Sequence, residues 1–128
     1  MKGLAVVALA TLLGAGSGAL AADYQVRMVY FGADGRPMRF EPAFLQIAPG
    51  DTVTFIPADR GHNSESVLGM IPAGAKTWKG EIDEPVAVTF TVPGLYGYES
   101  APQVGVGMVG LIQVGSNIDN LGALQEAS

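Results

Sequence analysis

The chain has 128 residues, with 12 acidic and 7 basic side chains and a formal net charge of −5 at pH 7. That length suits a single domain, and the acidic balance argues against a nucleic-acid partner, whose phosphates would repel it. Cysteine is absent, which excludes disulfides, thiol redox chemistry and iron–sulfur clusters.

The first 21 residues have the pattern of a secretory signal peptide. Lys2 supplies the positive start, residues 3–13 form a short apolar run, and Ala19-Leu20-Ala21 offers small residues at cleavage spacing. A membrane anchor is the alternative, but a span needs about 18 or more apolar residues. We therefore expect residues 1–21 to be removed on export. The mature domain, residues 22–128, would carry a formal charge of −6 because Lys2 is lost, and would make no further membrane contact.

Strand signals dominate the first half of this domain. From Tyr24 to Tyr30 the residues at every second position are apolar, so one face of a strand should be buried there. Breaks follow at a Gly/Asp turn (residues 32–35), at Glu41-Pro42 and at the turn Ala48-Pro49-Gly50-Asp51. Residues 38–40 lead into the break at Glu41-Pro42, and the segments after it predict short strands at residues 44–47 and 52–56.

The second half begins with a long, irregular segment. Residues 57–84 contain scattered glycines and charges, and we expect a functional loop region there with one helical turn near residues 75–79. Further strands are predicted at residues 86–92, 95–99 and 108–114. A short amphipathic helix is expected over residues 117–127, with these side chains inward: Ile118, Leu121 and Leu124. Short strands with Pro/Gly turns predict an all-β sandwich or barrel with Greek-key connections.

Six sequence blocks resemble the pseudoazurins of the cupredoxin family. They are FEPA (40–43), APGDTVTFIP (48–57), GHN (61–63), GMIP (69–72), PGLYG (93–97) and GMVG (107–110). The resemblance implies a Greek-key β-sandwich of about eight strands with copper near one end. It also implies a periplasmic location and the transfer of single electrons between redox partners.

The same resemblance assigns the metal-ligand positions. The family binds copper through one His and then through a Cys, a second His and an axial Met from one later loop. His62 and Met108 match the first His and the Met, whereas Ser100 and Gln103 stand in place of the Cys and the second His. A type 1 site depends on its thiolate and two imidazoles. We therefore expect copper to be absent or weakly bound and the chain to be a degenerate binding module. The alternative is a copper electron carrier that uses His62 and Met108 with non-standard ligands.

Residues around these positions are expected to serve structural roles. Asn63 matches a residue that clips the two ligand loops together, and it could hydrogen-bond Ser100. Ser100 and Gln103 are expected to fill the vacated cavity and to hydrogen-bond each other and His62. Met38, like Met108, is expected to pack in the core or to cover the site.

An apolar surface is expected over this polar pocket, formed by Met38, Ile71, Pro72, Pro102 and Val104. Such a surface could meet a protein partner, for example a periplasmic redox protein. The family typically rings this face with lysines, but here only Lys76 and Lys79 lie in the long loop and acidic residues outnumber them. A partner that docks by charge would therefore carry a basic patch.

A serine beside a histidine also suggests a hydrolase. However, the sequence places no acidic residue to orient His62, shows no oxyanion hole and lacks a Gly-x-Ser-x-Gly elbow around Ser100. We therefore expect that the chain is not an enzyme.

Overall fold

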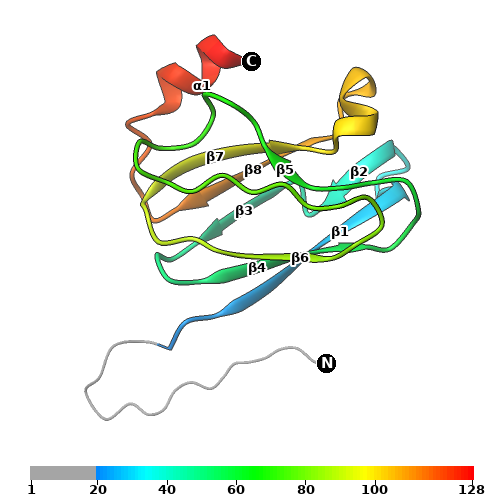
Figure 1. The fold of residues 1–128 in the computed structure, drawn as a ribbon, viewed down its shortest axis with the longest axis horizontal. Coiled ribbons are helices and arrows are strands. Elements are labelled where there is room, and N and C mark those ends of the chain that lie inside the picture. Colours follow the sequence, from blue (N-terminus) through cyan, green and yellow to red (C-terminus); the bar gives the residue numbers. More distant parts are fainter. Residues whose placement is uncertain (1–19) are drawn as a thin grey trace.

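The computed structural model describes residues 20–128, which form two four-stranded sheets packed as a sandwich (Figure 1). The first sheet has the order β2-β1-β4-β6, with β1 (Asp23–Phe31), β2 (Pro37–Glu41), β4 (Thr52–Pro57) and β6 (Val86–Thr89). The second has the order β3-β8-β7-β5, with β3 (Phe44–Ile47), β5 (Glu65–Ser66), β7 (Gly94–Glu99) and β8 (Val109–Val114). Most of the predicted signal peptide, residues 1–19, lies outside the described residues, so that prediction stays open.

The connections between the sheets are of the Greek-key kind. β1 pairs in parallel with β4, with Asp23 opposite Thr52, and β3 pairs in parallel with β8, whereas the other strand pairs are antiparallel. The short helix α1 (Leu121–Ala127) ends the chain. The predicted all-β, cupredoxin-like Greek-key sandwich with a short C-terminal helix is therefore confirmed. No helix in residues 20–128 is long and apolar enough to cross a membrane.

An aromatic cluster fills the space between the sheets. Tyr98 packs edge-on against Phe40 and Phe55, with ring centroids 4.7 and 5.0 Å away, and Trp78 stacks on Phe55 at 5.9 Å. Trp78 lies in the long loop, where its indole N–H donates to Ser64 Oγ at 3.0 Å. Burying this large ring holds the loop onto the core.

Three local predictions need correction. Residues 75–79 form no helical turn, because Trp78 is drawn into the core and Lys79 pairs with Glu65 in an isolated bridge. The C-terminal helix begins only at Leu121, and of its predicted inward residues only Leu124 is buried, while Ile118 and Leu121 are exposed. One short helix can pack only one face against the sheet. A 3-10 helix, η2 (Ala101–Val106), was not predicted at all.

The ring of Tyr98 requires glycine at the opposite position of β8. Tyr98 and Gly110 are partners in the strand register, and a Cβ atom added at Gly110 would lie 2.2 Å from Tyr98 Cζ. Tyr98 is 1% exposed, and burial raises the pKa of its hydroxyl. The ring therefore has little freedom to move away.

We expect Gly110→Ala to lower the free energy of unfolding by about 3 kcal/mol, because the added methyl overpacks a rigid core. Chemical denaturation monitored by fluorescence measures this effect. Gly122→Ala is the matched control, because a Cβ there meets nothing within 4 Å and alanine favours a helix by about 1 kcal/mol. Equal stability of the two variants would contradict this account of Tyr98.

Candidate functional site

Three segments bring the predicted ligand positions to the end of the sandwich that carries η2 (Figure 1, the gold coil). The loop after β4 supplies His62, the end of β7 leads into Ser100, and Met108 lies just before β8. Gln103 lies within η2. His62, Ser100 and Met108 are fully buried, whereas Gln103 is half-buried.

The side-chain amide of Gln103 is the centre of a hydrogen-bond network. Its Oε1 accepts from Ser100 Oγ at 2.5 Å and lies 3.0 Å from His62 Nδ1, while its Nε2 donates to the Gly61 carbonyl at 2.8 Å. Ser100 Oγ in turn accepts from the backbone N–H of Asn63 at 3.1 Å. The predicted bonds among His62, Ser100 and Gln103 are therefore confirmed.

This network fixes the tautomer of His62. An amide oxygen only accepts hydrogen bonds, so Nδ1 of His62 must carry the proton and donate it to Gln103 Oε1. The other ring nitrogen, Nε2, is buried and has no hydrogen-bond partner among residues 20–128. The nitrogen that faces Ser100 and Gln103 is thus occupied as a donor and offers no lone pair there.

The Asn63 side chain joins three neighbouring segments. Its Nδ2 donates to Glu65 Oε1 and to the Gly80 carbonyl, both at 3.0 Å, and its Oδ1 accepts from the backbone N–H of Ala101 at 2.8 Å. The predicted clip between the two loops is confirmed. The bond to Ser100, however, comes from the Asn63 backbone rather than from its side chain.

Both methionines pack as predicted. Met108 is fully buried in the core cluster, and its carbonyl accepts from the Ser100 backbone N–H at 3.0 Å. Met38 is partly buried against the same cluster. Tyr30 was missed by the sequence reasoning: its ring lies edge-on to His62 with centroids 5.4 Å apart. The only sequence signal for Tyr30 was its position at the end of a predicted strand.

The predicted apolar surface is only partly present. Pro102 is exposed on η2, and so are Val104 and Val106, by 48% and 67%. Ile71 and Pro72 do not belong to this surface, and that part of the prediction is wrong. Ile71 packs against the core, and Pro72 is buried beside Gly94 at the start of β7, because this loop runs back along β7 towards the α1 end.

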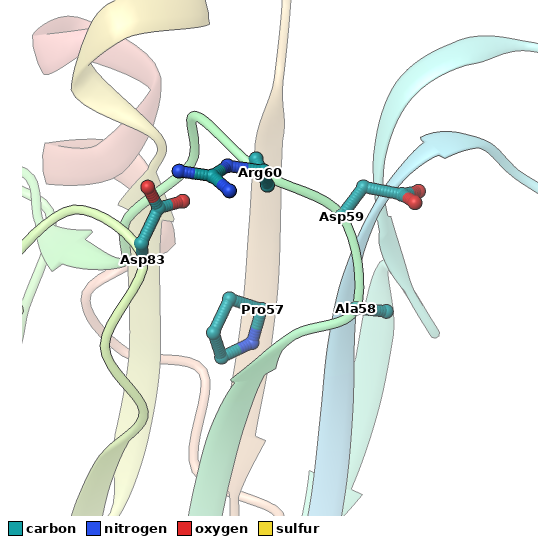
Figure 2. Close-up of a pocket in the computed structure, with 5 residues that line it drawn as sticks. All are labelled: Pro57, Ala58, Asp59, Arg60 and Asp83. Atoms are coloured by element: carbon teal, nitrogen blue, oxygen red, sulfur yellow. The ribbon is translucent and has the colours of Figure 1, made fainter.

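A shallow pocket of about 320 Å³ lies at the loop after β4 and is lined by these residues (Figure 2): Pro57, Ala58, Asp59, Arg60 and Asp83. In it the Arg60 side chain extends towards Asp83, whereas the Asp59 carboxylate points away from both. Asp83 Oδ1 accepts from the Gly61 N–H at 2.6 Å and Asp59 Oδ2 accepts from the Tyr30 N–H at 2.7 Å. These carboxylates therefore shape the loop that carries His62.

The site presents one imidazole, one thioether, one hydroxyl and one amide at the four ligand positions, without a thiolate. Within residues 20–128, no three His, Cys, Asp or Glu side chains come together as a possible metal group. Ser100 donates to Gln103 rather than to His62, so the nucleophile–base contact of a serine hydrolase is not made. The expectation that the chain is not an enzyme stays a prediction.

A Greek-key sandwich of two four-stranded sheets, with a histidine loop and a later methionine loop at one end, has the architecture of a cupredoxin. Residues 26–115 match the family described as copper binding proteins, plastocyanin/azurin family. A relative in Rhizobium leguminosarum bv. viciae is 51% identical over 116 residues, which is 91% of this chain and 76% of the relative. The pseudoazurin of Paracoccus pantotrophus is 42% identical, over 94% of this chain and 82% of its own.

Structural comparison gives the same answer. A pseudoazurin from Sinorhizobium superposes with a TM-score of 0.81 at 50% identity, covering 84% of each chain. The chain belongs to the pseudoazurins, within the plastocyanin/azurin family of copper-binding proteins.

We expect Gln103→Ala to lower the free energy of unfolding by about 2 kcal/mol, because it leaves buried polar groups of His62 and Ser100 without their acceptor. Denaturant unfolding measures the loss. Val104→Ala, an exposed change on the same short helix, should stay within about 0.5 kcal/mol. A ¹⁵N spectrum of the unsubstituted protein should show the proton on His62 Nδ1, and a proton on Nε2 instead would disprove the network as described.

Proposed function

We propose that this chain is an exported, periplasmic pseudoazurin-type protein in which a hydrogen-bond network replaces the type 1 copper centre. It then acts as a protein-binding module rather than as an electron carrier. The observation that carries the proposal is the shared acceptor: Ser100 and His62 both donate to Gln103 Oε1.

The chemistry of the donors supports this proposal. A type 1 site needs a thiolate and two imidazoles, and the copper–thiolate bond sets its redox behaviour. The Ser100 hydroxyl is a neutral, hard donor, and Gln103 offers only an amide oxygen. To bind metal through Nδ1, His62 would have to lose its proton there and give up its bond to Gln103.

The retained His62 and Met108 favour one alternative, a copper carrier with non-standard ligands. A neutral imidazole and a thioether suit Cu(I) better than Cu(II). Both residues are fully buried, so a metal reaching them would have to open the loop that contains Gln103. The alternative therefore requires a rearrangement of that loop, whereas the proposed network does not.

We expect purified protein mixed with Cu(II) to give no intense blue thiolate band and no reversible one-electron wave. The double variant Ser100→Cys with Gln103→His should gain both, because the rest of the loop is already held by Asn63. Absorption spectroscopy and voltammetry measure the difference. A blue band in the unsubstituted protein would disprove the proposal.

An anaerobic Cu(I) titration separates the proposal from its alternative. Stoichiometric Cu(I) binding that is lost in Met108→Leu would support a His/Met site, since this exchange nearly conserves volume and removes only the thioether. Ile112→Leu, at another fully buried core position, is the packing control.

For the partner, we propose a protein with an apolar patch and basic groups around it. Val104 and Val106 are exposed on η2. A loop close by carries the exposed acids Glu81, Asp83 and Glu84, and the backbone N–H of Asp83 donates to the His62 carbonyl at 3.0 Å. Two such acidic faces would repel each other, which disfavours a second copy as the partner.

We expect a lysine-rich c-type cytochrome, used as the probe, to bind this face with an affinity that falls as salt is added. Glu81→Gln with Glu84→Gln should weaken binding several-fold, and Val106→Ser should weaken it without changing the salt dependence. Glu126→Gln, in α1, is the charge control. Binding that is insensitive to all of these changes would rule out this face.

A further inference from the structure

The carboxylate of Asp51 is buried, and among residues 20–128 it has no cationic partner. Asp51 is 4% exposed and lies in the turn between β3 and β4. Its Oδ2 accepts from the Ala48 N–H at 2.9 Å and its Oδ1 from the Ala22 N–H at 2.8 Å. Across residues 20–128 the ion pair found is Arg36–Asp34, elsewhere on the surface. An ionised carboxylate removed from water normally meets an opposite charge.

The first strand of the described residues follows directly after the residue that contacts this carboxylate. The Ala22 carbonyl accepts from the Thr52 N–H at 3.0 Å, and β1 starts at Asp23. Leu20, two residues earlier, is 76% exposed. The Ala19-Leu20-Ala21 segment that predicts cleavage, with small residues at its first and third positions, ends immediately before Ala22. The predicted cleavage bond therefore lies directly before the residue that contacts Asp51.

We infer that cleavage of the Ala21–Ala22 bond supplies the missing charge, by placing a new N-terminal ammonium on the Asp51 carboxylate. This inference rests on the proposed export. In the hydrolysis, water adds its hydroxyl to the Ala21 carbonyl carbon and a proton to the Ala22 nitrogen. A signal peptidase is the class of enzyme required. The freed amine takes up a further proton at neutral pH, because its ordinary pKa is about 8.

At the contact with Asp51, the precursor and the mature chain then differ in the charge of the Ala22 nitrogen. In the precursor Ala22 offers a neutral amide N–H, whereas in the mature chain it offers a charged donor at the same place. Charge-assisted hydrogen bonds are about twice as strong as neutral ones. The pKa of nearby Tyr24 is raised, mainly by burial and secondly by the charge of Asp51. The Asp51 carboxylate therefore has an electrostatic effect on a neighbouring side chain. The mature domain is therefore more stable than the same domain with its leader attached.

Thermal unfolding of four chains, with and without Ala21 and with Asp or Asn at position 51, tests the ion pair between the Ala22 ammonium and Asp51. A chain that begins at Ala22 is compared with one that keeps Ala21, each released from a fusion without added residues. We expect the extra residue to lower Tm by about 4 °C, as the loss of one charged hydrogen bond should in a domain of this size. In the Asp51→Asn background the extension should change Tm by less than about 1 °C. Asp23→Asn, an exposed change beside Ala22, should leave the full effect.

N-terminal acetylation of the mature chain gives a second measurement that needs no substitution. It removes the charge but keeps the N–H, and should lower Tm as the extension does. Equal Tm values for the free, acetylated and extended chains would overturn the ion pair. Mass spectrometry of the exported chain tests the processing step, and a first residue other than Ala22 would overturn that step. Retention of the whole precursor in the cytoplasm would overturn the proposed export, while the Tm cycle still decides the ion pair.

Discussion

The acceptor Gln103 Oε1 organises one whole end of this sandwich. It receives hydrogen bonds from Ser100 and His62, two side chains on loops that are 38 residues apart in the sequence. Leaving a buried polar group without a hydrogen-bond partner costs free energy of folding. The single amide of Gln103 therefore holds both loops in place. Asn63 reinforces this arrangement through Ala101 and Gly80, and the backbone of Met108 completes it. The site can therefore be ordered by hydrogen bonds alone.

This arrangement shows how a cupredoxin scaffold can accommodate Ser100 and Gln103 at two ligand positions. Removing a thiolate and an imidazole from a metal site would leave a polar cavity beneath an aromatic core. Here a hydroxyl and an amide satisfy each other and His62, while Tyr30 covers the imidazole ring. Only His62 Nε2 is left without a partner in this network. The network thus gives the polar side chains at these ligand positions hydrogen-bond partners from within the chain.

Much of the sandwich could be predicted from the sequence, because alternating strands and Pro/Gly turns are local signals. The 75–79 segment could not be, since the burial of Trp78 against Phe55 is a tertiary effect that overrides local preference. The resemblance carries three-dimensional information: His62, Ser100 and Gln103 are hydrogen-bonded to one another, and Met108 joins them through its backbone. The resemblance could not give the direction of each hydrogen bond, nor the turn of chain that moves Pro72 to the far end of β7.

Buried polar groups need partners both at the η2 end and at Asp51, but the two places differ in how those partners are supplied. At the η2 end the demand comes from neutral groups, and a neutral amide with both donor and acceptor atoms can satisfy several of them at once. At Asp51 the buried group can be ionised, and neutral N–H donors from Ala22 and Ala48 leave its charge uncompensated. A side-chain cation could have been placed there, but a chain terminus needs no long flexible side chain to be ordered. Cleavage before Ala22 would place the new terminus directly against that carboxylate.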